Sequence, residues 1–398
     1  MPSSLLRQRV FRTIWLAQFV SVFGDFLALF GVIIAITFRL HGTPVDVALV
    51  TVAYTAPVAI ISPLAGVLVD RWPTKPLMIA SDLLRAGIAA SLVLGHSVPQ
   101  IALSMAALGF VSSFFAPAQA VAIRTLIARE DLLQANALLQ QAFYVVRIVA
   151  PAIAGQLVVL FTEKVCFWFD ATSFVFSAAM IGTLAILRPV AVKKERHMGR
   201  DFLEGNRFIF THKELGFAFV ASAAAMLVLS SFSPLISIYI RDTLAAGPRA
   251  YGIISALVGV GLIAGTALVR KASEKREVST VILLGLLGLG AGAVLLGAFR
   301  NVVAAGASTF TIGFAIAFVI VPGTTLSQKA TPPEMQGRVS STFLSLFSLA
   351  QVVGLLGSGA LAEELTVRGL FLAAGAAMAV LAFAGKAFLK SRPVATAG

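Results

Sequence analysis

The chain of 398 residues is poor in charge, in cysteine and in histidine. Only 12% of its residues are Asp, Glu, Lys or Arg, whereas a soluble domain carries about a quarter. The single cysteine, Cys166, excludes an internal disulfide, and the four histidines lack the spacing of a metal site. No glycine-rich phosphate loop or catalytic group of residues occurs, so we expect no enzyme, no metal and no cofactor.

Apolar residues make up 58% of the chain, and the mean hydropathy is +0.93. They form continuous runs of about 20 residues or more, which is the length that a membrane-spanning helix needs, without the polar alternation of a barrel strand. We therefore predict an all-α membrane protein with twelve transmembrane helices. The predicted spans lie near residues 10–38, 46–69, 76–95, 100–121, 139–161, 166–187, 215–239, 250–270, 279–299, 302–323, 339–361 and 366–388.

One longer connection, 188–213, separates six predicted spans from six. We therefore predict an N-terminal six-helix bundle (1–187), a linker (188–213) and a C-terminal six-helix bundle (214–398). Phenylalanines alternate with charged residues in the second half of the linker, which indicates either an amphipathic segment on the membrane surface or a solvated connection.

The net charge of +13 comes from 31 basic and 18 acidic residues. Most of the basic residues fall at one set of span ends, together with both termini and the linker. Because basic residues concentrate on the cytoplasmic side of membrane proteins, we expect both termini to be cytoplasmic. The charge therefore indicates contact with membrane lipids and requires no nucleic-acid partner.

The connection between the second and third spans carries the most specific motif. Gly66, Asp70, Arg71 and Lys75 match a signature loop of the major facilitator superfamily, a large family of transporters, whereas Pro73 stands where that family usually has glycine. The resemblance implies two six-helix bundles that expose a central substrate site to either side of the membrane in turn.

The two halves also resemble each other. The segment that follows span four, 117–138, has a counterpart after span ten, 322–339, with proline, basic and Gln residues in the same order. A repeat about 200 residues apart is similar to the parallel-repeat arrangement of the superfamily, in which substrate binds near mid-membrane.

Further segments narrow the resemblance to one branch of the superfamily. Residues 115–118, 131–138, 170–174 and 333–339 are similar to bacterial macrolide, multidrug and siderophore exporters, and more distantly to the bacterial lysophospholipid flippase. This resemblance implies a monomer in the bacterial inner (plasma) membrane that exports an amphipathic small molecule, with protons as the coupling ion. A lipid or lysophospholipid flippase and a non-transporting receptor or scaffold remain as alternatives.

Asp25 lies near the middle of the first span, where an ionised carboxylate is costly unless it faces water or a partner. We predict that it carries the coupling proton or binds a substrate cation, or else that it forms a structural ion pair or a helix–helix hydrogen bond. Arg147, in span five, is always charged and needs an acid, a headgroup or an anionic substrate. Asp25 is its first candidate partner, with a purely structural counter-ion as the alternative.

Other polar residues within the spans are candidates for a central cavity: Gln18, Tyr144 and Gln351, beside Asp25 and Arg147. Pro151 and Gly155 resemble the antiporter motif of drug/proton exporters, although they could simply bend or pack the helix.

Asp82 and Arg85 stand one turn apart, so they can pair. We place them at the inner end of span three, in a charge cluster with Arg124 or Arg129, and we expect Asp170 to be an interfacial anchor or a cap. The predicted cytoplasmic gate comprises Gly66, Asp70, Arg71, Lys75, Asp82, Arg85, Arg124, Gly337 and Arg338.

Overall fold

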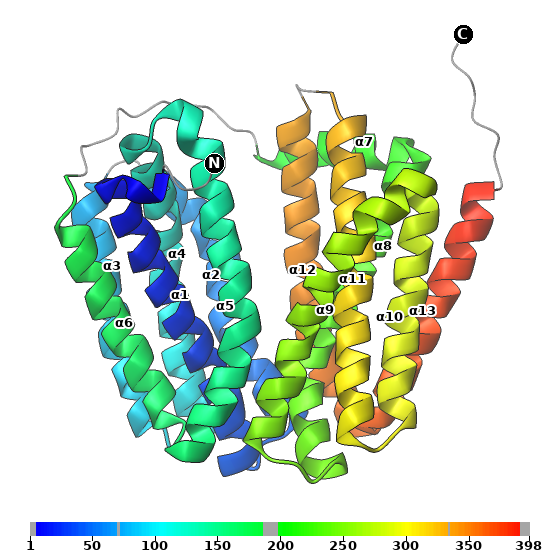
Figure 1. Cartoon of the computed structure of the whole chain (residues 1–398), viewed down its shortest axis with the longest axis horizontal. Helices are drawn as coiled ribbons and strands as arrows, with labels where there is room; N and C mark the ends of the chain where they lie inside the picture. The colour runs from blue at the N-terminus through cyan, green and yellow to red at the C-terminus, as the bar shows by residue number, and fades with distance from the viewer. Residues whose placement is uncertain (1–4, 70–71, 186–197, 333–334, 391–398) are drawn as a thin grey trace. The chain divides into compact units, whose positions relative to one another are not determined.

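The computed structural model describes residues 5–69, 72–185, 198–332 and 335–390, and these residues form helices and no β-strand (Figure 1). Twelve helices are long and apolar enough to cross a membrane, which confirms the predicted fold class. The helices are α1 (Arg9–Ile34), α2 (Pro44–Val69), α3 (Thr74–Ser91), α4 (Val98–Leu126), α5 (Leu132–Leu160), α6 (Lys164–Gly182), α7 (Met198–Thr211), α8 (Lys213–Ile238), α9 (Pro248–Lys275), α10 (Val278–Ala298), α11 (Val302–Ala330), α12 (Gln336–Glu364) and α13 (Val367–Lys390).

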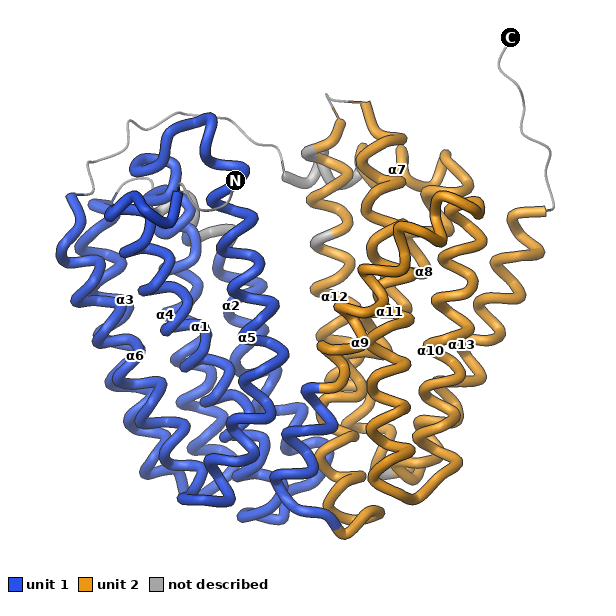
Figure 2. The backbone as a smooth tube through the Cα atoms, viewed as in Figure 1, with its two compact units in different colours: residues 1–193, 246–256 blue, residues 194–245, 257–398 orange. Residues whose placement is uncertain are grey.

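The helices form two compact units (Figure 2). Unit 1 comprises residues 1–193 and 246–256, and thus holds α1 to α6 and the first turns of α9. Unit 2 comprises residues 194–245 and 257–398. Within unit 1, α6 packs against both α1 and α3, and α4 packs against α2 and α3. Within unit 2, α10 packs against α11 and α13, and α8 packs against α12.

The two halves of the chain repeat the same succession of helices at a constant interval. Helices α1 and α8 begin at residues 9 and 213, α4 and α11 at 98 and 302, and α5 and α12 at 132 and 336, and each pair is 204 residues apart. The internal repeat predicted from the sequence is therefore present in the structure as a repeat of whole helices.

The repeat extends to unusual backbone conformations. A π-helical turn follows α1 at Ala35–Arg39 and follows α8 at Tyr239–Thr243. His41 and Ala245, again 204 residues apart, have φ angles of 50° and 48°, a conformation that costs a non-glycine residue energy. Because two different residues adopt it at equivalent places, the conformation is required by this type of connection.

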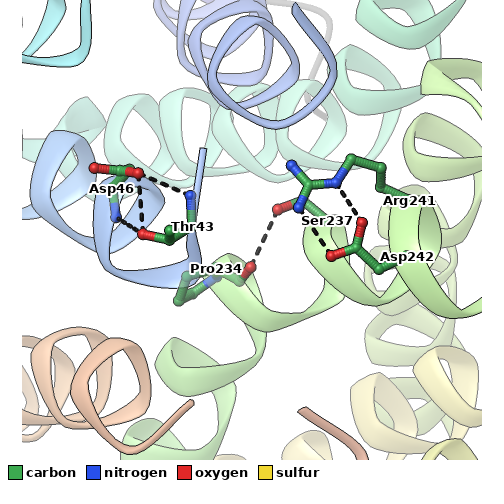
Figure 3. A network of polar contacts seen from close by, with 6 residues as sticks. All are labelled: Thr43, Asp46, Pro234, Ser237, Arg241 and Asp242. Atoms are coloured by element: carbon green, nitrogen blue, oxygen red, sulfur yellow. Dashed lines mark hydrogen bonds and ion pairs between the residues drawn. The ribbon is translucent and has the colours of Figure 1, made fainter. Parts of the chain in front are cut away.

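Polar contacts fix the ends of these connections in each unit (Figure 3). In unit 1, Thr43 and Asp46 form a reciprocal pair at the start of α2: the Thr43 N–H donates to Asp46 Oδ2 (2.8 Å), and the Asp46 N–H donates to Thr43 Oγ1 (3.2 Å). This pair satisfies N–H groups at a helix start that have no partner within the helix. In unit 2, Arg241 holds the neighbouring Asp242 by two bonds, at 2.5 and 2.8 Å.

Part of the predicted linker forms helix α7, and one of its apolar side chains is buried in unit 2. Ile209 is fully buried in a cluster with Leu215, Phe219, Val339 and Phe343 of unit 2, whereas Phe210 stays exposed. The apolar side of α7 therefore packs on α8 and α12 as well as facing outward. Residues 188–197 lie outside the described part of the chain.

Glycines allow helices to approach closely at equivalent places in both units. A Cβ atom on Gly109 of α4 would lie 2.2 Å from the Tyr54 carbonyl oxygen of α2. A Cβ atom on Gly313 of α11 would lie 1.9 Å from the Val258 carbonyl oxygen of α9, and both residues of this pair are 204 positions later. Small residues of this kind let membrane helices pack backbone to backbone.

We predict that Gly109→Ala and Gly313→Ala each destabilise the protein, because the added methyl group forces two helices apart. Overpacking of this kind typically costs about 1–3 kcal/mol, and the thermal unfolding midpoint in detergent measures it. Gly87→Ala is the control, since no atom lies within 4 Å of its added methyl group. Unchanged midpoints in both test variants would contradict the close contacts.

Candidate functional site

Asp25 lies on α1, next to a close contact between α1 and α6. A Cβ atom on the preceding residue, Gly24, would lie 2.3 Å from Ser173 Oγ and 2.8 Å from Asp170 Oδ1 of α6. Asp170 is only 1% exposed, and its Oδ1 is buried without a hydrogen-bond partner among the described residues. The absence of a side chain at Gly24 therefore lets the Asp170 carboxyl lie against α1, one residue before Asp25.

The expectation that Asp170 is an interfacial anchor or a cap is wrong. Helix α6 begins at Lys164, so Asp170 lies about two turns inside it, and its buried side chain faces α1. Position along a span gives the depth of a residue but not the side of the helix on which it lies. The contact with Gly24 settles that side.

Asp82 and Arg85 of α3 form the predicted pair. Their side chains are joined by a hydrogen-bonded ion pair, and the residues are 0% and 3% exposed. The Arg85 guanidinium also lies over the rings of Phe115 and Phe174, at 4.1 and 4.3 Å from the ring centres. Cation–π contacts of this kind gain strength when water is excluded, so Arg85 is fixed on three sides.

The position predicted for this pair, in a cytoplasmic cluster with Arg124 or Arg129, is wrong. Because α3 begins at Thr74, Asp82 lies about two turns inside the bundle, where α3 packs against α6. Arg124 is exposed, and its Nε donates to the Ala120 carbonyl of its own helix (3.1 Å).

Arg85, and not Arg147, is the base that interacts electrostatically with Asp25. Arg147 is exposed on α5 and forms no ion pair with the described acids, so the predicted Asp25–Arg147 pair is not formed. Asp25 also interacts with Asp82 and Asp170. Unit 1 thus contains a cluster of three carboxyl groups and one guanidinium, which we call the α1–α3–α6 charge cluster: Asp25, Asp82, Asp170 and Arg85.

A cavity of about 500 Å³ opens on another side of α1, between α1, α4 and α5. Gln119 of α4 donates a side-chain hydrogen bond to Gln18 of α1 at its wall. Further amides and Arg124 add polar groups, and aromatic and aliphatic side chains supply the apolar wall. The lining residues are Gln18, Phe19, Val22, Ala116, Gln119, Ala120, Ile123, Arg124, Leu132, Asn136, Leu139, Gln140, Ala142 and Phe143.

The predicted cavity residues thus separate in the structure. Gln18 lines the cavity, whereas Asp25 belongs to the charge cluster seven residues further along α1. Tyr144 is 44% exposed on α5 and meets the edge of the Phe143 ring. Gln351 is exposed on α12, in unit 2. Sequence reasoning missed Gln119 and Asn136, although an amide inside an apolar span is a recognisable signal.

The predicted gate residues also separate. Lys75 Nζ donates to the carbonyls of Gly182 (2.6 Å) and Leu184 (2.8 Å), at the end of α6, where a cation is favourable. Arg338, near the start of α12, forms an ion pair with Glu204 of α7. Gly66 and Gly337 lie within α2 and α12, and Asp70 and Arg71 lie outside the described residues.

Pro151 and Gly155 lie in the second half of α5, in contact with the first turns of α9 that belong to unit 1. A Cβ atom on Gly155 would lie 2.7 Å from the Pro248 carbonyl oxygen, and one on Gly252 would lie 2.5 Å from the Pro151 carbonyl oxygen. These residues therefore allow α5 and α9 to touch through their backbones.

Known proteins resemble this chain over nearly its whole length. It is 26% identical to the MFS-type transporter YfiS of Bacillus subtilis, over 97% of this chain and 95% of the relative. It is 24% identical to macrolide efflux protein A of Streptococcus pyogenes, over 92% of each chain. Among solved structures, a mutant of the nucleoside transporter NupG superposes with a TM-score of 0.78 at 15% identity, over 96% of this chain and 100% of that one.

The model of one protein family, described as transmembrane secretion effector, matches residues 2–395. This match spans both units and all twelve candidate membrane helices, and the fold of the solved transporter agrees with it. The chain is therefore a multi-pass membrane transporter, not an enzyme, and it belongs to the transmembrane secretion effector family of the major facilitator superfamily.

Proposed function

We propose that this protein exports amphipathic small molecules from the cytoplasm by alternating access, driven by protons. The observation that carries the proposal is the cavity of about 500 Å³ between α1, α4 and α5, in which amide groups stand beside aromatic and aliphatic side chains. Sites for small organic ligands typically combine a mostly apolar wall with a few hydrogen-bonding groups. The similarity to macrolide efflux protein A supports export as the direction of transport.

The lining of the cavity favours a ligand class. It contains four amide side chains and one arginine but no carboxylate. A cationic drug would find no counter-ion there, whereas a neutral molecule with several hydroxyl or carbonyl groups would find donors and acceptors. The lactone ring of a macrolide offers such groups, and its cationic amino sugar would lie away from this lining. Arg124 also suits a phosphate headgroup, which keeps lysophospholipid flipping as the second candidate function of the same cavity.

Proton coupling is the second part of the proposal, and Asp25 is its first candidate. Moving between a protonated and an ionised state is what a coupling group must do, and Asp25 lies among other charges inside an apolar helix bundle. We also propose a monomer in a bacterial inner membrane, with both termini cytoplasmic, which the bacterial relatives and the basic residues support.

We predict that Asp25→Asn abolishes transport driven by a pH gradient but preserves substrate exchange, because only the titrating proton is lost. Proteoliposomes loaded with a macrolide measure both rates, with and without an imposed gradient. Asp46→Asn, at the exposed start of α2, is the matched control. Full gradient-driven transport in Asp25→Asn would remove Asp25 as the coupling residue.

We predict that Gln119→Leu weakens macrolide binding roughly twofold to twelvefold, since a hydrogen bond to an uncharged group is worth about 0.5–1.5 kcal/mol. A hydrophobic dye without such groups should bind about as before. Ligand-induced quenching of tryptophan fluorescence gives both affinities, and Phe110→Ala, on α4 but outside the cavity lining, is the control. Two results together would favour lipid flipping over macrolide export. The first is that Arg124→Gln lowers the affinity of the protein for lysophosphatidylglycerol, and the second is that the protein counter-transports this lipid but not the macrolide.

We predict that a thiol reagent added outside intact cells labels His96→Cys and leaves Arg129→Cys unlabelled. Both positions are exposed, at opposite ends of α4, and the native Cys166 is buried. The reverse pattern would invert the proposed orientation.

A further inference from the structure

The α1–α3–α6 charge cluster contains more acid than its single base can balance. Asp25, Asp82 and Asp170 together would carry three negative charges, and Arg85 carries one positive charge. Arg85 is already committed to Asp82, whose second carboxylate oxygen is buried without a hydrogen-bond partner among the described residues, as is Asp170 Oδ1. An ionised carboxylate inside an apolar bundle is strongly unfavourable without a partner.

The internal repeat shows that the fold does not need these charges. Positions 204 residues after Asp25, Asp82 and Arg85 are Leu229, Leu286 and Leu289. Leu286 and Leu289 are fully buried in α10 of unit 2, so leucine fills the same positions of the same helix pattern. In α13, which begins 203 residues after α6, the counterparts of Asp170 are Ala373 or Ala374. The charges in unit 1 are therefore additions to a packing that works without them.

We propose that Asp170 is a second proton-binding carboxyl group, and that Asp25 and Asp170 form one two-carboxyl proton site beside the Asp82–Arg85 ion pair. The proposal deepens the proposed function, since it rests on the proton being the coupling ion. Gly24 makes the site possible, because any side chain there would collide with Asp170. The three carboxyl groups do not converge as ligands of a metal ion, in the part of the chain that the structure describes.

The groups that face this site come from four helices. Asp25 is on α1, Asp82 and Arg85 are on α3, Asp170 is on α6, and Tyr54 of α2 interacts with Asp25, Asp170 and Arg85. Asp25 and Asp170 interact electrostatically, so the ionisation of each depends on the state of the other. Arg85 cannot lose its proton and only shifts this balance.

Infrared difference spectroscopy on the purified full-length protein, titrated from acid to alkaline pH, tests this inference. The carbonyl stretch of a protonated carboxyl group is the signal, and neither substrate nor gradient is needed. Exposed carboxyl groups also titrate, so the readout is the high-frequency end of this band, where carboxyl groups shielded from water absorb. We expect two pH-dependent components there in the native protein. Asp170→Asn should remove one, and the other, from Asp25, should titrate at lower pH because a neighbouring negative charge is gone.

Asp46→Asn is the control, since its carboxyl group is exposed and should leave both components unchanged. If Asp170→Asn fails to fold, Asp25→Asn decides alone: one remaining pH-dependent component supports the site, and none overturns it. An unchanged spectrum in folded Asp170→Asn also overturns it. So does displacement of the protonated signal by sodium ions at constant pH, which would indicate a sodium site.

The spectroscopic test and the transport test can reject their hypotheses separately. If the protein exports nothing against a proton gradient, the two carboxyl components still report the site. If Asp25→Asn abolishes gradient-driven transport but Asp170→Asn leaves the spectrum unchanged, proton coupling stands and only the second carboxyl group is lost.

Discussion

The polar groups within the membrane spans of this protein are governed by the lack of water around the helices. Backbone N–H and C=O groups must find their hydrogen-bond partners within each segment, so these apolar runs form long uninterrupted helices. The same constraint applies to side chains, so a charge within a span needs a partner inside the bundle. Arg85 illustrates the solution: Asp82 balances it, and two aromatic rings cover its faces.

Close approach of helices is the second consequence. Without a hydrophobic driving force between helices in lipid, packing depends on small residues that bring backbones together. At Gly109 and Gly313 this contact is purely structural, and it occurs in both units. At Gly24 the close contact has another effect, because the groups that fill the space are the Ser173 hydroxyl and the Asp170 carboxyl. The close packing of α1 and α6 thereby brings a carboxyl group into the α1–α3–α6 charge cluster.

The sequence could predict the twelve spans because apolar runs of sufficient length have few other structures available. It also predicted the Asp82–Arg85 pair, since residues three apart on a helix are neighbours. It does not predict which side of a helix faces which neighbour. Asp170 lies on α6 and Arg147 on α5, within predicted spans, yet the first faces α1 and the second forms no ion pair with Asp25.

Helix α1 connects the two polar regions of unit 1. Gln18 contacts Gln119 at the cavity, and Asp25 lies seven residues later, about 10 Å along the axis, in the charge cluster. A rigid helix shared by both regions is a direct physical link, because a ligand that shifts α1 against α4 must also change its contact with α6 at Gly24. The Ser173 hydroxyl and the Asp170 carboxyl occupy the space that a side chain at position 24 would need, so both lie directly against this part of α1. Ligand binding and proton binding would then bias the same element, which is the condition for a coupling free energy between two sites.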